Sequence, residues 1–107
     1  MVHEVPGARF RPSELPAGRV PVLFTTDWCG YCRRFYPHYA RLGGGWVVDI
    51  SDDDDPLWDD LQIRVVPTVI LFEDGRPVAR WAGALTAVQA DEIAAALRGG
   101  DGSGAEA

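Results

Sequence analysis

The sequence has 107 residues, a length typical of one domain, and 47% of them are hydrophobic, which is enough for a globular core. Its net charge is −6, and all 10 basic residues are arginine. Nucleic acids and anionic membranes require a concentrated basic surface, so the composition argues against both as partners. The absence of lysine also excludes Schiff-base chemistry on a lysine side chain.

The N-terminal region shows no apolar run behind a basic segment, and Pro6, Pro12 and Pro16 interrupt it. We therefore predict neither a signal peptide nor a transmembrane helix, and we expect a cytoplasmic location. Residues 1–19 are predicted to form an irregular segment packed on the domain, with a short edge strand at residues 8–11.

The following elements are read from apolar runs and the residues that interrupt them. We predict strands at residues 20–26, 46–50, 68–72 and 77–81, and helices at residues 29–42, 56–62 and 86–98. Pro37 should kink the first helix. Asp74-Gly75 predicts a tight hairpin turn, and Thr86 with Gln89 predicts a capping box at the start of the last helix.

This order of elements predicts an α/β fold. A strand–helix–strand unit places its two strands in parallel, and the hairpin adds antiparallel strands. The expected architecture is a mixed sheet of four to five strands with helices on both faces. Residues 20–98 would form this domain, and residues 99–107 are predicted to be a disordered tail.

Two cysteines in the pattern C-x-x-C mark the candidate active site. Cys29 falls between a strand and a helix, where free N–H groups and the helix dipole stabilise a thiolate. Cys32 follows on the same helical face. We expect Cys29 to be exposed and to attack a substrate disulfide, and Cys32 to be shielded and to resolve the mixed disulfide. Gly30 would let a substrate backbone approach, and Trp28 would supply an apolar wall.

Other readings of these residues remain open. A structural zinc site needs about four ligands, and besides the two cysteines the chain offers only His3 and His38, of which His38 is expected to face solvent. A structural disulfide across so short a loop would add little stability. The acidic run at residues 51–55 is interpreted as a solvated helix cap, since it lacks the spaced ligands of a calcium loop.

Two segments resemble the thioredoxin family. Residues 24–32, FTTDWCGYC, with Pro37, are similar to its active-site strand and helix, and residues 64–75, RVVPTVILFEDG, to the segment around its cis-proline. The resemblance covers residues 20–98 and implies a thioredoxin-like fold with an abbreviated N-terminal strand and helix. It also implies that Cys29 is the nucleophile, that Cys32 is the resolving thiol and that the Val66–Pro67 bond is cis. The substrate-binding residues would be Trp28, Gly30, Tyr31, Val66, Pro67 and Gly83.

The sequence also departs from the family pattern. Leu23 stands where the family carries a buried aspartate, and the lysine often found near that aspartate has no counterpart. The dipeptide between the cysteines is Gly30-Tyr31 instead of Gly-Pro. Because the aspartate and the lysine are missing, we expect a slower proton transfer from Cys32 than in a typical thioredoxin.

The function predicted from these observations is that of a dithiol–disulfide oxidoreductase. It would reduce or exchange protein disulfides as a monomer without a cofactor, and a reductase or a small thiol would supply the electrons. One alternative is a glutaredoxin-like reductase that uses a low-molecular-weight thiol. Another is a non-catalytic thioredoxin-like module that binds a metal or a partner protein.

Overall fold

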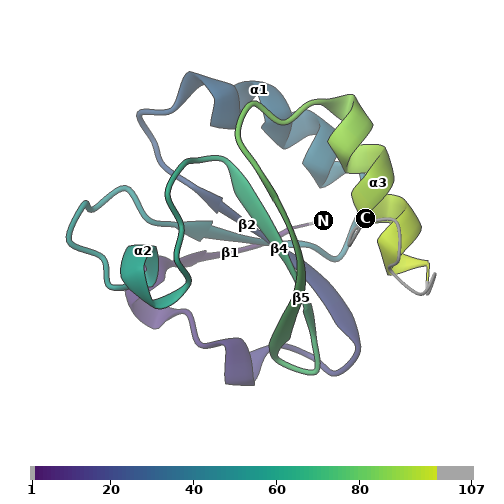
Figure 1. The fold of residues 1–107 in the computed structure, drawn as a ribbon, viewed down its shortest axis with the longest axis horizontal. Helices are drawn as coiled ribbons and strands as arrows, with labels where there is room; N and C mark the ends of the chain where they lie inside the picture. Colours follow the sequence, from purple (N-terminus) through teal and green to yellow (C-terminus); the bar gives the residue numbers. More distant parts are fainter. Residues whose placement is uncertain (1, 99–107) are drawn as a thin grey trace.

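A computed structural model describes residues 2–98 (Figure 1). Its regular elements alternate between strands and helices in the order expected for residues 20–98. They are, in chain order, β1 (His3–Pro6), η1 (Gly7–Arg9), η2 (Pro12–Glu14), β2 (Arg19–Thr25), α1 (Gly30–Ala40), β3 (Trp46–Asp49), α2 (Leu57–Asp60), β4 (Thr68–Glu73), β5 (Arg76–Ala82) and α3 (Ala87–Leu97). No helix within the described residues is long and apolar enough to cross a membrane.

The five strands form one mixed sheet in the order β1-β3-β2-β4-β5. β3 pairs in parallel with both β1 and β2, and β4 pairs antiparallel with both β2 and β5. The parallel pairing of β2 with β3 confirms the predicted crossover through α1. Because the carboxyl ends of parallel strands lie at one edge of a sheet, the segment that follows β2 and leads into α1 meets the segment that follows β3.

Each face of the sheet carries its own hydrophobic core. α1 and α3 cover one face, while the N-terminal segment and α2 cover the other (Figure 1). Alternate residues of one strand enter different cores, as the period of two in a β-strand requires. In β2, Leu23 packs with the helices, and its neighbours Val22 and Phe24 pack with the N-terminal segment.

The N-terminal segment is more regular than the sequence predicted. His3–Pro6 forms the edge strand β1, whereas residues 8–11, where an edge strand was expected, lie in and just after a 3-10 helix. The cause is Phe10, which is 2% exposed and packs against the rings of Phe24 and Phe72. Burial of this aromatic ring in the core stabilises the turn that carries it. The abbreviated strand and helix expected here are thus β1 and two single 3-10 turns.

The remaining predicted strands and helices are present with small shifts at their ends, and Pro37 lies inside α1. Asp74 and Gly75 both have positive φ, 53° and 84°, and form the hairpin turn between β4 and β5. Thr86 caps α3 in a capping box with Gln89. The tail predicted at residues 99–107 lies outside the described residues.

A buried tyrosine joins α1 to the sheet. The hydroxyl of Tyr39 lies 2.8 Å from the carbonyl oxygen of Pro21 in β2 and 2.7 Å from that of Trp46 in β3. Burial raises the pKa of Tyr39, so it remains a neutral donor. A Cβ on Gly45 would lie only 2.7 Å from this hydroxyl, so glycine makes room for the contact. Tyr39 therefore fixes α1 over the strands that position the cysteines.

Candidate active site

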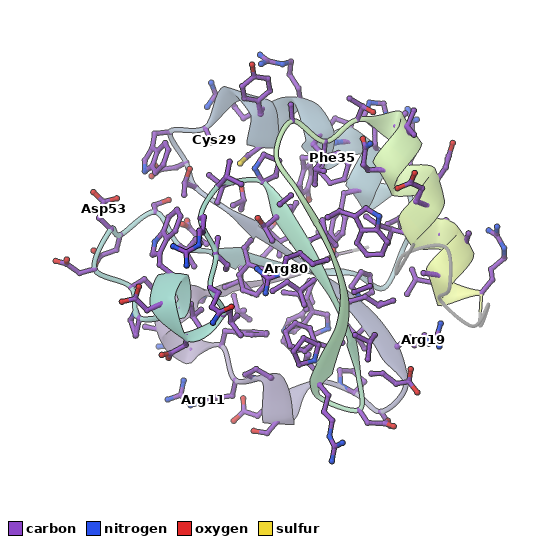
Figure 2. All side chains as sticks on the ribbon, in the orientation of Figure 1. Arg11, Arg19, Cys29, Phe35, Asp53 and Arg80 are labelled. Carbon is purple, nitrogen blue, oxygen red and sulfur yellow. The ribbon has the colours of Figure 1, made fainter. Side chains whose placement is uncertain are left out.

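The two cysteines occupy the first turn of α1. Cys29 is the N-cap, with extended backbone angles, and its Sγ accepts a hydrogen bond of 3.2 Å from the backbone N–H of Cys32. Figure 2 shows the Cys29 sulfur directed inward from the start of α1. The N-cap position gives the sulfur a donor that would otherwise have no partner in the first turn of the helix.

Both thiols are enclosed, which was expected for Cys32 but not for Cys29. Cys29 is 7% exposed and Cys32 is 2% exposed. The expectation of an exposed Cys29 is therefore wrong. The reason is the segment before β4, which covers the cysteine, and the Cys29 thiol donates a hydrogen bond of 3.6 Å to the carbonyl oxygen of Val66. That contact spans 37 residues of chain, and no local pattern predicts it.

The environment of Cys32 keeps its thiol protonated. Burial and the contact with Cys29 together raise the pKa of Cys32 to about 11, and burial is the larger cause. The Thr25 side chain and the Thr26 backbone lower the pKa of Cys32 and so act in the opposite direction. Near neutral pH, Cys32 is thus a thiol that must lose its proton before it can attack a disulfide.

An apolar groove of about 380 Å³ opens beside Cys29. We call it the Trp28 groove. It contains the most exposed aromatic side chains of the described chain, with Trp28 57% and Tyr31 55% exposed. Its lining residues are Trp28, Cys29, Gly30, Tyr31, Trp58, Arg64, Val65 and Val66.

Four of the six expected substrate-binding residues line this groove, and two do not. Trp28, Gly30, Tyr31 and Val66 lie in it. The Val66–Pro67 bond is cis, the isomer that the resemblance implies. Pro67 is buried behind Val66, and the Pro67 carbonyl accepts a hydrogen bond of 3.1 Å from the backbone N–H of Gly83. The groove thus ends at Val66.

The sequence analysis missed Trp58, Arg64 and Val65 as lining residues. Trp58 comes from α2, and its indole N–H lies 3.2 Å from the carbonyl oxygens of Ile50 and Asp52. The indole N–H of Trp28 lies 3.3 Å from the carbonyl oxygen of Ser51. Both tryptophans therefore hold the loop after β3, which carries the acidic run and the labelled Asp53 (Figure 2), beside the groove.

Leu23 lies inside the protein, but not against the cysteines. It is fully buried and packs in the core that contains Phe35 and Tyr39 of α1. Phe35 lies between α1 and the sheet (Figure 2). Leu23 therefore sits next to residues one and two turns further along α1 than Cys32, in a fully apolar setting.

The two histidines lie away from the cysteine pair. The His3 ring packs on Trp46 at 4.1 Å between centroids, and the half-buried His38 lines a shallow depression with α3 residues. Half-burial means that His38 faces solvent only in part, contrary to the expectation. Among residues 2–98, no three His, Cys, Asp or Glu side chains are grouped so that they could hold a metal ion.

Comparison with known proteins points to one family. The family model described as Thioredoxin matches residues 13–98. The chain is 33% identical over 104 residues to the chloroplastic F-type thioredoxin of Mesembryanthemum crystallinum, covering 90% of this chain and 52% of that protein. It is 32% identical over 77 residues to a thioredoxin of Chlamydia pneumoniae, covering 66% of this chain and 74% of that one.

Solved structures agree with these sequence matches. The crystal structure of spinach chloroplast thioredoxin F, in its short form, superposes with a TM-score of 0.76 at 28% identity, covering 91% of this chain and 93% of that chain. This chain spans about half the length of the F-type relatives it matches in sequence.

Proposed function

This chain belongs to the thioredoxin family, and from that premise we propose that it is a thiol–disulfide oxidoreductase that reduces or exchanges protein disulfides. The observation that carries the proposal is the arrangement of the two cysteines. Cys29 opens on the Trp28 groove, and Cys32 lies behind it, buried and protonated, within reach through the first turn of α1. The Cys29 sulfur is placed to react with a substrate, and the Cys32 sulfur is placed to react with Cys29.

The reaction follows from this arrangement in two steps. The Cys29 thiolate attacks one sulfur of the substrate disulfide, forms a mixed disulfide and releases the other substrate sulfur as a thiolate. The backbone N–H of Cys32, 3.2 Å from Cys29 Sγ, stabilises the negative charge on Cys29 before the attack. Cys32 then loses its proton and attacks Cys29 Sγ. The Cys29–Cys32 bond forms as the bond to the substrate breaks, and the substrate leaves fully reduced.

We propose that an extended protein segment occupies the Trp28 groove. The groove's exposed apolar side chains offer buried contact area to a polypeptide. The carbonyl oxygen of Val66, already 3.6 Å from Cys29 Sγ, lies where a substrate backbone N–H would pair with it. A reductase or a small thiol would return the Cys29–Cys32 disulfide to the dithiol.

Two single substitutions test this function. With Cys32→Ser, the first step proceeds and the second cannot, so a protein disulfide such as insulin should be trapped as a mixed disulfide on Cys29. With Cys29→Ser, neither trapping nor insulin reduction should occur. Gel electrophoresis without reducing agent and mass spectrometry detect the adduct. Trapping on Cys32 in the Cys29→Ser protein, or turnover by either variant, would contradict the assigned roles.

The compartment and the oligomeric state are also part of the proposal. A dithiol that acts as a reductant requires a reducing compartment, which supports a cytoplasmic location for this chain. A groove open to a protein substrate supports a monomer as the active form. Light scattering of the reduced protein over a hundredfold range of concentration checks the monomer, and fractionation of the source cells checks the compartment.

A further inference from the structure

The chain between α2 and β4 forms part of the Trp28 groove but has no regular secondary structure of its own. We call residues 61–67 the groove segment, of which Arg64, Val65 and Val66 line the groove. The helix before it, α2, has four residues, and so short a helix is not stable without tertiary contacts. The position of the groove segment must therefore come from contacts with the rest of the protein.

Arg80 in β5 binds the first two residues of the groove segment. Its guanidinium donates a hydrogen bond of 2.7 Å to the carbonyl oxygen of Leu61 and one of 3.2 Å to that of Gln62 (Arg80 is labelled in Figure 2). Carbonyls at the end of a helix have no partner within it, and the planar fork of an arginine suits two neighbouring oxygens. Arg80 thus attaches the end of α2 to a strand of the sheet.

The turn at Gln62 is one that needs such support. Gln62 has a φ of 55°, which lies in the left-handed region where residues other than glycine are uncommon. The backbone N–H of Ile63 donates a hydrogen bond of 2.8 Å to the carbonyl oxygen of Trp58, which closes the last turn of α2. The turn therefore directs the chain out of the helix and into the groove segment.

Two parts of the groove depend on this turn. Before it, α2 carries the lining residue Trp58, and after it Val66 places its carbonyl oxygen 3.6 Å from Cys29 Sγ. β5 also holds the far end of the groove segment, because the backbone N–H of Gly83 donates a hydrogen bond of 3.1 Å to the carbonyl oxygen of Pro67. One strand at the edge of the sheet thus holds both ends of the segment that faces the nucleophilic cysteine.

Within the proposed function, we propose that Arg80 is a positioning residue for the binding of protein substrates. Arg80 does not line the groove, and it acts through the groove segment that it attaches to β5. An extended protein segment would lie against Val65 and Val66, whereas a small disulfide requires only access to the Cys29 sulfur. Loss of the two hydrogen bonds should therefore weaken the binding of a protein and leave the chemical steps unchanged.

The test compares kcat and KM for the reduction of insulin, with dithiothreitol as the source of electrons. Arg80→Met removes the donors and keeps an unbranched apolar side chain. In this variant KM should rise about fivefold and kcat should stay within about twofold of the wild type, because a displaced binding surface must be ordered when the substrate binds. Arg80→Lys keeps the charge without the planar fork and should have an intermediate KM. Both variants should reduce hydroxyethyl disulfide at the wild-type rate.

Arg76 provides the matched control. It lies on the same strand and is exposed like Arg80, and its side chain makes no hydrogen bond or ion pair with any of residues 2–98. Arg76→Met removes the same charge and should leave KM for insulin at the wild-type value. An equal rise of KM in Arg76→Met would attribute the effect to surface charge and overturn the role of Arg80.

A double variant separates positioning from stability. Gln62→Gly relieves the positive φ, since glycine adopts it without steric cost. Added to Arg80→Met, it should return the urea midpoint of unfolding toward the wild-type value but leave KM raised, because glycine stabilises the turn without attaching it to β5. A KM that returns to the wild-type value would show that Arg80 acts through stability alone. If Arg80→Met does not fold, the double variant is compared with Gln62→Gly.

The outcomes distinguish this inference from the proposed function. An unchanged KM for insulin in Arg80→Met, or an equal loss of activity on hydroxyethyl disulfide, overturns the role of Arg80 while the function stands. If the wild type reduces neither insulin nor the small disulfide, the proposed function fails and this inference fails with it.

Discussion

The front and the back of the cysteine pair differ in chemistry although the two residues share one helical turn. The front is the Trp28 groove, where exposed aromatic side chains surround Cys29 and the carbonyl oxygen of Val66 contacts its sulfur. The back is the interior around Cys32, which is 2% exposed and whose pKa burial raises to about 11. The difference teaches that one disulfide-forming pair can hold one sulfur beside an apolar binding surface and keep the other as a buried, protonated thiol.

The largest effect expected from this contrast is in the reactivity of Cys32. Because burial raises its pKa to about 11, the thiolate fraction should increase about tenfold per pH unit below that value. Alkylation of Cys32 in the reduced protein should therefore be about a thousandfold faster at pH 10 than at pH 7. Iodoacetamide labelling read by tandem mass spectrometry measures it. A Cys32 alkylation rate that levels off near pH 8 would contradict the raised pKa of this thiol.

The second effect is on stability and concerns the apolar core between the sheet and α1, in which Leu23 packs. Leu23→Asp places a carboxylate in a fully buried apolar site and should lower the free energy of unfolding at pH 7 by roughly 4 kcal/mol. Burial raises the pKa of that carboxyl in the folded state, so the folded state binds more protons than the unfolded state. Stability should then fall as pH rises from 4 to 7.

Leu23→Asn is the matched control for this prediction, since it is polar and of similar shape but does not titrate. Urea unfolding of both variants at pH 5 and pH 7 separates charge from polarity. A Leu23→Asp protein whose stability shows the same pH dependence as Leu23→Asn would mean that position 23 is hydrated.

A third, smaller effect concerns the front. Val65 is 44% exposed and lines the Trp28 groove, whereas Val88 is 60% exposed on α3 and does not. Val65→Ser should lower kcat/KM for a protein disulfide by about fivefold, because roughly 1 kcal/mol of apolar contact is lost. Val88→Ser should leave it unchanged. Both variants should reduce a small neutral disulfide at the wild-type rate, and a loss on that substrate would indicate damage beyond the groove.

The smallest effect concerns a hydrogen bond to Val65, one of the residues that line the Trp28 groove. The hydroxyl of Thr68, a residue that is 1% exposed, donates a hydrogen bond of 2.6 Å to the carbonyl oxygen of Val65. Thr68→Val should lower the free energy of unfolding by about 1 kcal/mol and kcat/KM for protein substrates by roughly twofold. Thr68→Ser keeps the donor and should have a weaker effect on both. Equal losses in the two variants would attribute the effect to packing.

The sequence predicted the sheet from β2 onward because those elements carry strong local signals. Residues 20–24 form an unbroken apolar run, and Asp74-Gly75 has the chemistry of a hairpin turn. β1 has no such signal, because its four residues are mostly exposed and Val5 alone is half-buried. An edge strand of this kind is determined by its partner β3, not by its own pattern.

The sequence predicted those parts of the site that depend on residues close together in the chain. The C-x-x-C spacing and the strand-to-helix position identify Cys29 and Cys32. Their depth depends on Val66, whose carbonyl oxygen meets the Cys29 sulfur across 37 residues of chain. Contacts of that range depend on the tertiary fold.

Tyr39, described above as a contact between α1 and the sheet, also marks a boundary of rigidity. It meets the carbonyl of Pro21 just where β2 changes from one neighbour to two, since residues 19–21 pair with β4 alone while Val22 to Phe24 pair with both β3 and β4. Proline lacks an N–H, and here it lies before the pairing with β3 begins. Opening of β2 at residues 19–21 breaks hydrogen bonds to one neighbouring strand. Opening at residues 22–24, closer to Cys29, must break hydrogen bonds to two strands. Amide hydrogens of β2 beyond Pro21 should thus exchange slowest, so that thermal opening leaves the spacing of the two sulfurs unchanged.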